Sequence, residues 1–180
     1  MSRGASLLAL LEQHRAADDR EEGFRRRMRA LAAEGESAFA RTQFDPGHFT
    51  ASAFVRSPDR GSILLVLHGK LGRWLQPGGH VDPEDQDVAA AAAREVAEEV
   101  GIHGLVPGGG PLDLDIHAIP PLRGDPTHEH FDVRFEFVAP SWEFVAGSDA
   151  RAARWVQLEQ VSETESDASV MRAVEKLRRR

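Results

Sequence analysis

The sequence predicts an α+β domain with a mixed β-sheet, preceded by an N-terminal helical extension. Three observations support this fold class. Apolar residues recur at helical spacing in the first ~45 residues, alternation typical of strands begins at residue 49, and the later segments follow no regular βαβ order. We therefore expect residues 1–45 to form the extension and residues 46–180 to form the domain.

The composition excludes several classes of protein. Of the 180 residues, 41% are hydrophobic and 28% are charged, which is typical of a folded domain and not of a disordered chain. The chain has no cysteine, which excludes disulfides, thiolate metal sites and cysteine nucleophiles. The net charge of -7 disfavours stable binding to nucleic acid. No apolar run is long enough to span a bilayer and no signal peptide is visible, so we expect a cytoplasmic protein without a membrane partner.

The extension is expected to be helical. Leu7, Leu10 and Leu11 share one helical face, and a second such stripe follows with Phe24 and Met28. Residues 45–47 read Asp-Pro-Gly, which predicts a turn before the domain. The extension could cap the site or mediate a homodimer.

The domain begins with two predicted strands, residues 49–56 and 62–68, joined by a hairpin-like connection. Residues 76–85 are expected to form a loop that contains Gly78 and Gly79. An alanine-rich helix follows over residues 87–100, and Gly101 is placed to end it.

The second half of the domain predicts three more strands and a final helix. Residues 107–111 are rich in proline and glycine and are expected to form a loop. The alternation that follows would place Leu112, Leu114 and Ile116 on one face of a strand. The remaining predictions are strands over residues 130–138 and 152–158, and a helix around Val170, Val174 and Leu177.

Three carboxylates share one arc of the alanine-rich helix. Glu95, Glu98 and Glu99 fall within about 100° of one another at helical geometry. Like charges at this spacing repel by a few tenths of a kcal/mol per pair, so a compensating cation is expected. Mg²⁺ takes hard oxygen ligands of this kind. Arg94 lies four residues before Glu98, where it can form an ion pair with that carboxylate.

The segment from Gly79 to Ile102 resembles the Nudix box. That pattern has a glycine, a glutamate six positions later, and, after eight more positions, the run Arg-Glu-aliphatic-x-Glu-Glu-x-Gly-aliphatic. This sequence matches the second part at each fixed position with Arg94, Glu95, Val96, Glu98, Glu99, Gly101 and Ile102. The turn from Trp74 to His80 and the strand from His128 to Asp132 also resemble a Nudix subgroup of unassigned substrate.

The first part of the segment departs from the family pattern. Arg94 lies fifteen residues after Gly79, whereas the pattern has fourteen. We interpret this as a one-residue insertion in the loop, with Asp85 or Glu84 standing in for the first glutamate of the pattern.

The resemblance implies a fold and an activity. The fold is an α/β/α sandwich with a mixed sheet, and the activity is attack of water on phosphorus in a nucleoside diphosphate derivative, with Mg²⁺ or Mn²⁺ as cofactor. It implies that Glu98 and Glu99 are metal ligands, assisted by Glu95 and by the carbonyl of Gly79, and that Arg94 orients a glutamate.

The sequence leaves the identity of the general base open. The resemblance allows a glutamate of the box or an acid on a later segment, and Glu136 and Glu143 are the candidates outside the box.

A histidine-rich pair of strands is the second candidate site. His130 and Asp132 share a strand face, and His117 has the same type of position on the preceding strand. His80 and His128 are further candidates for contact with the substrate. Three interpretations remain open: contact with the substrate, a structural polar cluster, or a distinct metal site.

The resemblance leaves two alternatives to hydrolysis. A Nudix module that binds a nucleotide-like ligand as a regulator would be expected to lack the metal-binding glutamates, which this chain retains. An isoprenoid isomerase is disfavoured by the absence of cysteine. The expected partner is a small nucleoside diphosphate derivative.

Overall fold

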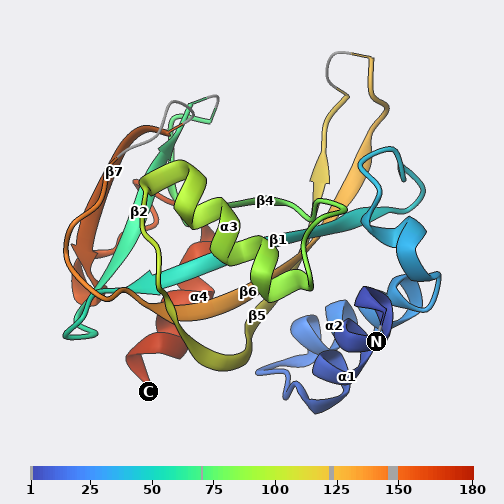
Figure 1. Ribbon diagram of the computed structural model, residues 1–180, viewed down its shortest axis with the longest axis horizontal. Coiled ribbons are helices and arrows are strands. Elements are labelled where there is room, and N and C mark those ends of the chain that lie inside the picture. Colours follow the sequence, from blue (N-terminus) through green and yellow to red (C-terminus); the bar gives the residue numbers. More distant parts are fainter. Residues whose placement is uncertain (1, 70, 122–123, 146–149) are drawn as a thin grey trace.

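The computed structural model describes residues 2–69, 71–121, 124–145 and 150–180. Within these residues, helices pack against a seven-stranded mixed sheet (Figure 1). The helices are α1 (Arg3–Gln13), α2 (Asp19–Ala32), α3 (Val88–Val100) and α4 (Ala168–Arg178), with short 3₁₀ helices at Gly35–Phe39 and Leu158–Gln160. The strands are β1 (Gly47–Arg56), β2 (Ser62–His68), β3 (Trp74–Leu75), β4 (Gly78–His80), β5 (Val106–Ile119), β6 (His128–Val138) and β7 (Ala150–Gln157). The α+β class and the N-terminal helices predicted from the sequence are confirmed.

Strand β1 lies at the centre of the sheet, whose main order is β3-β2-β1-β6-β5. One edge of β1 pairs in parallel with β6 along its whole length, from Gly47 to Arg56. The other edge pairs with the short strand β4 at Thr50–Ser52 and with β2 at Arg56. The parallel pairing brings residues about 80 positions apart in the sequence into direct register.

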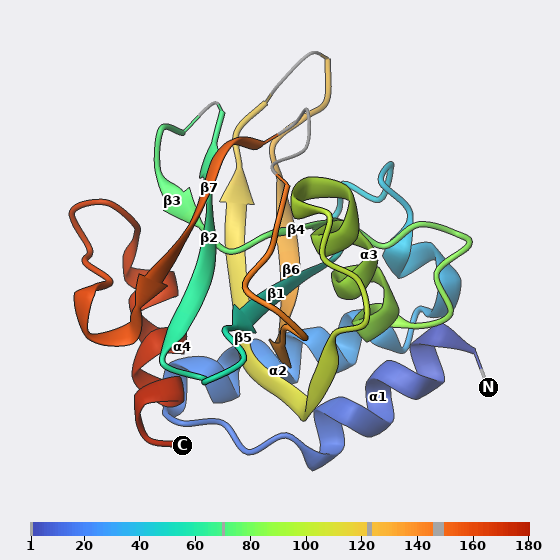
Figure 2. The same cartoon turned by 60° about the vertical axis from the view of Figure 1, so that its left-hand side comes forward.

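The two faces of the sheet are covered by different helices, which gives the expected sandwich. Figure 2 shows α3 and α4 on opposite sides of the sheet. Because successive strand residues face opposite sides, Ala53 of β1 packs in the cluster that contains α3, and its neighbour Phe54 packs with α4. In α4 the predicted apolar residues Val170, Val174 and Leu177 are all buried. Each such burial contributes roughly 1.5–3 kcal/mol.

Each α-helix begins at a residue that caps its free amides. The side chains of Ser2, Asp18, Asp87 and Asp167 each accept a hydrogen bond from a backbone N–H three residues later. Helix α3 ends at Gly101, which has a left-handed conformation with φ of 65°. The sequence prediction for α3 and for its end is therefore confirmed.

Two predictions on β5 are wrong. Residues 107–111 were expected to form a loop, but they belong to β5, which still pairs with β6 at Pro107 and Pro111. The pairing register shifts on both sides of Pro111. Because of this shift Leu112 packs in the α4 cluster, whereas Leu114 and Ile116 pack in the cluster of α3.

The loop expected over residues 76–85 contains the short strand β4, which the composition did not indicate.

The N-terminal helices share the core of the sheet. Leu7 and Leu11 of α1 and Met28 and Leu31 of α2 are buried in the same cluster as the apolar side of α3. The division at residues 45 and 46 stays a prediction. In the described parts of the chain, no helix combines the length and the apolar character that crossing a bilayer requires.

Candidate active site and histidine cluster

Strand β4 brings the backbone of Gly79 onto helix α3. In β4, Gly78 is paired with Ser52 of β1 and Gly79 with Ala51. A Cβ atom on Gly78 would lie 2.4 Å from Cβ of Ser52, and one on Gly79 would lie 2.5 Å from Oε1 of Glu95. Only glycine permits approaches this close. Gly78 therefore lets β4 lie close to β1, and Gly79 lets the backbone lie directly against a carboxylate of the helix.

Arg94 organises the acidic side chains around this contact. Its guanidinium donates two hydrogen bonds to Asp85, one to Glu95 and one to Glu98, at distances between 2.9 and 3.0 Å. It also donates to the backbone carbonyl of His80 at 2.9 Å. One cation thus fixes β4, the following loop and two of the three carboxylates on α3.

The electrostatics of this cluster follow from burial and from Arg94. The hydrogen bonds to Asp85 raise the pKa of the Arg94 guanidinium above its usual range, although burial acts in the opposite direction. Burial raises the pKa of Glu95, and the adjacent charge of Arg94 reduces this increase. Arg94 is therefore a permanent cation among carboxylates of different exposure.

The three glutamates of α3 are arranged along a gradient of exposure. The side chain of Glu95 is 13% exposed, that of Glu98 is 59% exposed, and Glu99 is half-buried. The donor set of carboxylates and a backbone carbonyl suits Mg²⁺ or Mn²⁺. The close approach of Gly79 to Glu95, which a Cβ would block, fits such an ion held between strand and helix.

Asp85, and not Glu84, is the loop acid that reaches the cluster. Its side chain is 6% exposed and forms the two-point contact with Arg94. Glu84 is exposed to solvent. Of the two loop acids that the sequence offers, the structure brings Asp85 to the box.

Five imidazole rings gather on the face of the sheet that lies opposite α3. We call them the histidine cluster, and its members are His48, His80, His117, His128 and His130. The pairing register explains the arrangement, because His130 of β6 is aligned with His48 of β1 and with His117 of β5. The ring centroids of His48 and His130 are 4.9 Å apart, and those of His48 and His128 are 5.2 Å apart. Four histidines predicted as site residues are thus brought together, and His48 joins them.

The cluster has a mixed electrostatic character. Burial lowers the pKa of His48, His80 and His130, that of His80 to about 4. His117 differs, because its Nδ1 lies 3.0 Å from the Asp115 carboxylate and this contact raises its pKa despite burial. The lowered pKa values of His48, His80 and His130 favour neutral imidazoles with available lone pairs at neutral pH.

Asp132 lies beside the cluster but is held in a buried network. Its carboxylate accepts hydrogen bonds from Thr50 at 3.3 Å, Ser52 at 2.8 Å and Arg134 at 2.9 Å. Its exposure is 5%. The structure therefore surrounds this carboxylate with three donors from the sheet itself.

A model of the NUDIX domain matches residues 46–175 of this sequence. The chain belongs to the Nudix family. Over 50 residues it is 44% identical to diphosphoinositol polyphosphate phosphohydrolase 2 of Rattus norvegicus, an alignment that covers 27% of each chain. The chain thus spans about a quarter of the length of that relative.

Solved Nudix structures share the fold. The MutT protein of Methanosarcina mazei superposes with a TM-score of 0.58 and 21% identity, covering 73% of this chain and 92% of that one. A C. elegans Ap4A hydrolase, solved as a binary complex, superposes with a TM-score of 0.54 and 20% identity, covering 73% and 95%. At these identities the likeness supports the fold alone.

The two candidate bases outside the Nudix box lie in different surroundings. Glu136 is buried on the α4 side of β6, where its carboxylate accepts from Arg56 and Arg180. Glu143 is exposed on the segment after β6. Glu136 is therefore already engaged by two arginines, whereas Glu143 is open to solvent.

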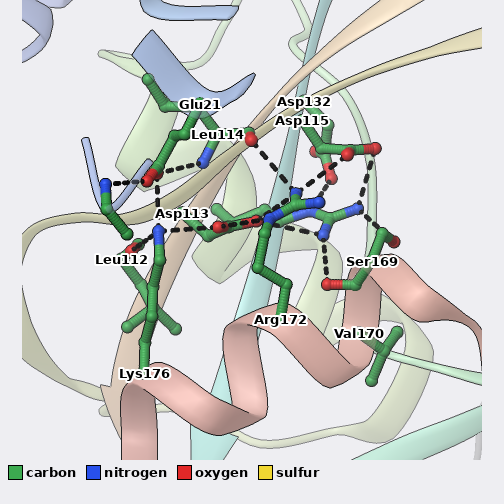
Figure 3. Close-up of polar contacts among 12 residues, drawn as sticks. Glu21, Leu112, Asp113, Leu114, Asp115, Asp132, Ser169, Val170, Arg172 and Lys176 are labelled. Carbon is green, nitrogen blue, oxygen red and sulfur yellow. Dashed lines mark hydrogen bonds and ion pairs between the residues drawn. The ribbon is translucent and has the colours of Figure 1, made fainter. Parts of the chain in front are cut away.

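A buried ionic network next to the histidine cluster was not foreseen from the sequence. Figure 3 shows Arg172 and Lys176 of α4 pointing at Asp113 of β5, and Lys176 also at Glu21 of α2. The Lys176 ammonium lies 2.6 Å from Glu21 and 2.7 Å from Asp113. The carboxylates at alternate positions of β5 indicated a charged strand face. Their cationic partners lie in distant segments, so the sequence did not reveal the network.

Proposed function

We propose that this Nudix protein is a metal-dependent hydrolase that cleaves a diphosphate linkage in a nucleoside diphosphate derivative. One observation carries the proposal: Glu95, Glu98 and Glu99 share one arc of α3, Glu95 lies against the backbone of Gly79, and Arg94 fixes Glu95 and Glu98. The names of the relatives, diphosphoinositol polyphosphate phosphohydrolase and Ap4A hydrolase, support a phosphorylated small molecule as substrate.

We assign the metal-holding role to Glu98 and Glu99, assisted by Glu95 and the carbonyl of Gly79. Bound Mg²⁺ or Mn²⁺ neutralises diphosphate charge and lowers the pKa of a coordinated water. Arg94 keeps Glu95 and Glu98 in a fixed orientation, which reduces the reorganisation needed when the substrate binds. Glu98 has the most exposed side chain of the three and is our candidate for accepting the proton of the attacking water.

We further propose that the substrate contacts the histidine-lined face of the sheet. His80 continues β4 directly after Gly79, so it connects the metal-holding backbone with that face. His80, His117, His128 and His130 would then contact the substrate, and Asp132 would hold Thr50 and Ser52 in place. We propose no nucleic acid or membrane partner and a cytoplasmic location. Pairing of two copies through α1 and α2 stays a prediction that light scattering tests.

The alternative is a Nudix module that binds a nucleotide-like ligand without cleaving it. The three glutamates and their ordered contacts with Arg94 favour catalysis, because a binding module does not need a metal-holding set.

One screen tests the proposal. The purified protein is incubated with Mg²⁺ or Mn²⁺ and nucleoside triphosphates, nucleotide sugars, dinucleotide cofactors, dinucleoside polyphosphates and CDP-alcohols, and phosphate-containing products are quantified. We expect metal-dependent turnover of at least one class. In Glu98→Gln, turnover should fall by about a hundredfold or more with the fold intact. Near-normal activity of Glu98→Gln would contradict the proposed role of Glu98 in metal binding and proton transfer. Tight binding of one compound without any turnover would favour the binding module.

A further inference from the structure

Three members of the histidine cluster each bring one ring nitrogen close to the nitrogens of the other two. One nitrogen each from His48, His128 and His130 lie within 4.8 Å of one another. Within the described residues, this is the group of three potential metal-ligating side chains whose ligand atoms lie close enough to share an ion. His48 and His130 are aligned across the parallel pair of β1 and β6, so the rigid centre of the sheet positions them. His128 is two residues before His130 and therefore faces the same side.

Hydrogen bonds fix the tautomers of two of these rings. Nδ1 of His48 lies 3.1 Å from the carbonyl oxygen of Gln43, and Nδ1 of His128 lies 2.9 Å from that of Pro126. A carbonyl oxygen only accepts, so Nδ1 must carry the proton in both rings. Nε2 of each ring is then left with a lone pair. Metal-bound histidines characteristically donate their other N–H to a carbonyl in this way.

The lone pair on His48 is buried without a hydrogen-bonding partner. His48 is 1% exposed, and its Nε2 has no hydrogen-bond partner among the described residues. A buried polar atom in this state destabilises the folded protein. A cation shared with His128 and His130 would satisfy it. An anion would not, since neutral imidazole nitrogens that carry lone pairs repel anionic oxygens.

We propose that His48, His128 and His130 form a binding site for a transition-metal ion, with Zn²⁺ as the favoured occupant. Three neutral imidazoles suit zinc, and a three-histidine site keeps a fourth position for water or a phosphate oxygen. Tetrahedral zinc, with bonds of about 2.0–2.1 Å, requires nitrogens about 3.4 Å apart. Closing from 4.8 Å or less to that separation requires movements of only about 1 Å shared between rings.

This site is distinct from the magnesium site proposed at α3. The histidines face the side of the sheet that carries α4, whereas the glutamates belong to the helix on the other side. The donor atoms also differ, because imidazole nitrogens favour Zn²⁺ and carboxylate oxygens favour Mg²⁺. The inference therefore does not depend on hydrolysis.

Zinc binding by protein without a histidine tag tests the site. The protein is stripped with a chelator, exchanged into buffer with excess Mg²⁺ to occupy the glutamates, and titrated with Zn²⁺ against a chromophoric chelator. We expect one Zn²⁺ per chain and a rise in Tm on zinc addition, since an ion that binds only the folded state stabilises it. Co²⁺ in the same site should give the visible absorption of a four-coordinate ion.

Matched variants locate the ion. His130→Ala and the more conservative His130→Asn should each weaken zinc binding by about a hundredfold and abolish the rise in Tm. His103→Ala removes an exposed histidine after α3 and should change neither quantity. Glu98→Gln should also retain zinc. Circular dichroism checks that each variant is folded, and His128→Ala provides a second ligand variant should His130→Ala unfold.

Three results would overturn the proposal. They are no zinc binding by the wild-type protein in excess Mg²⁺, unchanged binding in folded His130 and His128 variants, and loss of zinc in Glu98→Gln. The last result would place the ion at the glutamates. None of them affects the proposed hydrolysis, which the substrate screen tests separately.

Discussion

The guanidinium of Arg94 donates one hydrogen bond to each carboxylate oxygen of Asp85, and both donor–acceptor distances are 2.9 Å. Bidentate contacts of this kind restrict the rotation of both groups. The same guanidinium holds Glu95 and Glu98, so the orientation of the proposed metal ligands depends on a loop residue that precedes the helix.

Asp85→Asn should lower kcat by about tenfold to a hundredfold, because the amide provides only one acceptor and no charge for Arg94. Kinetics with the best substrate of the screen measure the effect. Glu84→Gln is the matched control, since Glu84 is exposed, and should behave like the wild-type protein. Equal losses in both variants would show that the two-point contact has no special role.

Gly79→Ala should lower activity by at least about tenfold, because its Cβ would lie 2.5 Å from Glu95 Oε1 and would displace either the strand or the carboxylate. Gly110→Ala is the control, since no atom lies within 4 Å of a Cβ built there. Metal-dependent turnover of both variants provides the comparison. Full activity of Gly79→Ala would mean that the close approach is dispensable.

Glu21→Gln should reduce stability at pH 7 by about 2–4 kcal/mol, because buried donors would lose their charged acceptor. Burial alone would raise the pKa of Glu21, but hydrogen bonds from His14, Lys176 and the Ala17 amide outweigh it and lower the pKa to about 2. A group with a lowered folded-state pKa contributes stability that is complete above its unfolded value of 4.5 and is lost as the pH falls towards 2.

Urea unfolding at several pH values between 7 and 3 tests this linkage. The difference in stability between the wild-type protein and Glu21→Gln should shrink as the pH falls below 4.5. Glu12→Gln, at a glutamate whose side chain is 60% exposed, should show little difference at any pH. A constant difference across the range would contradict the lowered pKa of Glu21.

Gly23→Ala should raise the free energy of unfolding by about 0.5–1 kcal/mol, because glycine in the interior of a helix costs that much relative to alanine. Gly23 lies inside α2, and a Cβ built on it meets no atom within 4 Å. Thermal or chemical unfolding measures the change. A decrease in stability would contradict the open space around Gly23.

Local patterns in the sequence predicted the helices and strands whose structure depends mainly on residues close together in the chain. The bounds of β2 follow from a short apolar run that ends at His68, and the end of α3 follows from a helix-ending glycine at Gly101. Helical spacing likewise predicted which side of α4 is buried, because the periodicity of a helix is set within a few residues.

Pairing between distant strands was the part that the sequence could not supply. His48 lies at the start of β1 and meets His130 only through the parallel pairing of β1 with β6. The irregular register near Pro111 likewise moved Leu112 to the other face, although its alternation with Leu114 was regular. Neither relationship leaves a signal among neighbouring residues.

Strand β4 also determines where this protein can tolerate changes in length. Gly79 and His80 are consecutive, so one supports the helix side of the sheet and the other the histidine side. Adding or deleting one residue within Gly78–His80 would exchange these faces, and both sites would be lost together. Between Asp82 and Gln86 the chain is not paired with the sheet. An extra residue there would change the position of Asp85 relative to Arg94 and leave the register of β4 unchanged. Lineages that diverge from this sequence, and libraries built on it, should therefore vary in length in that loop and keep β4 constant.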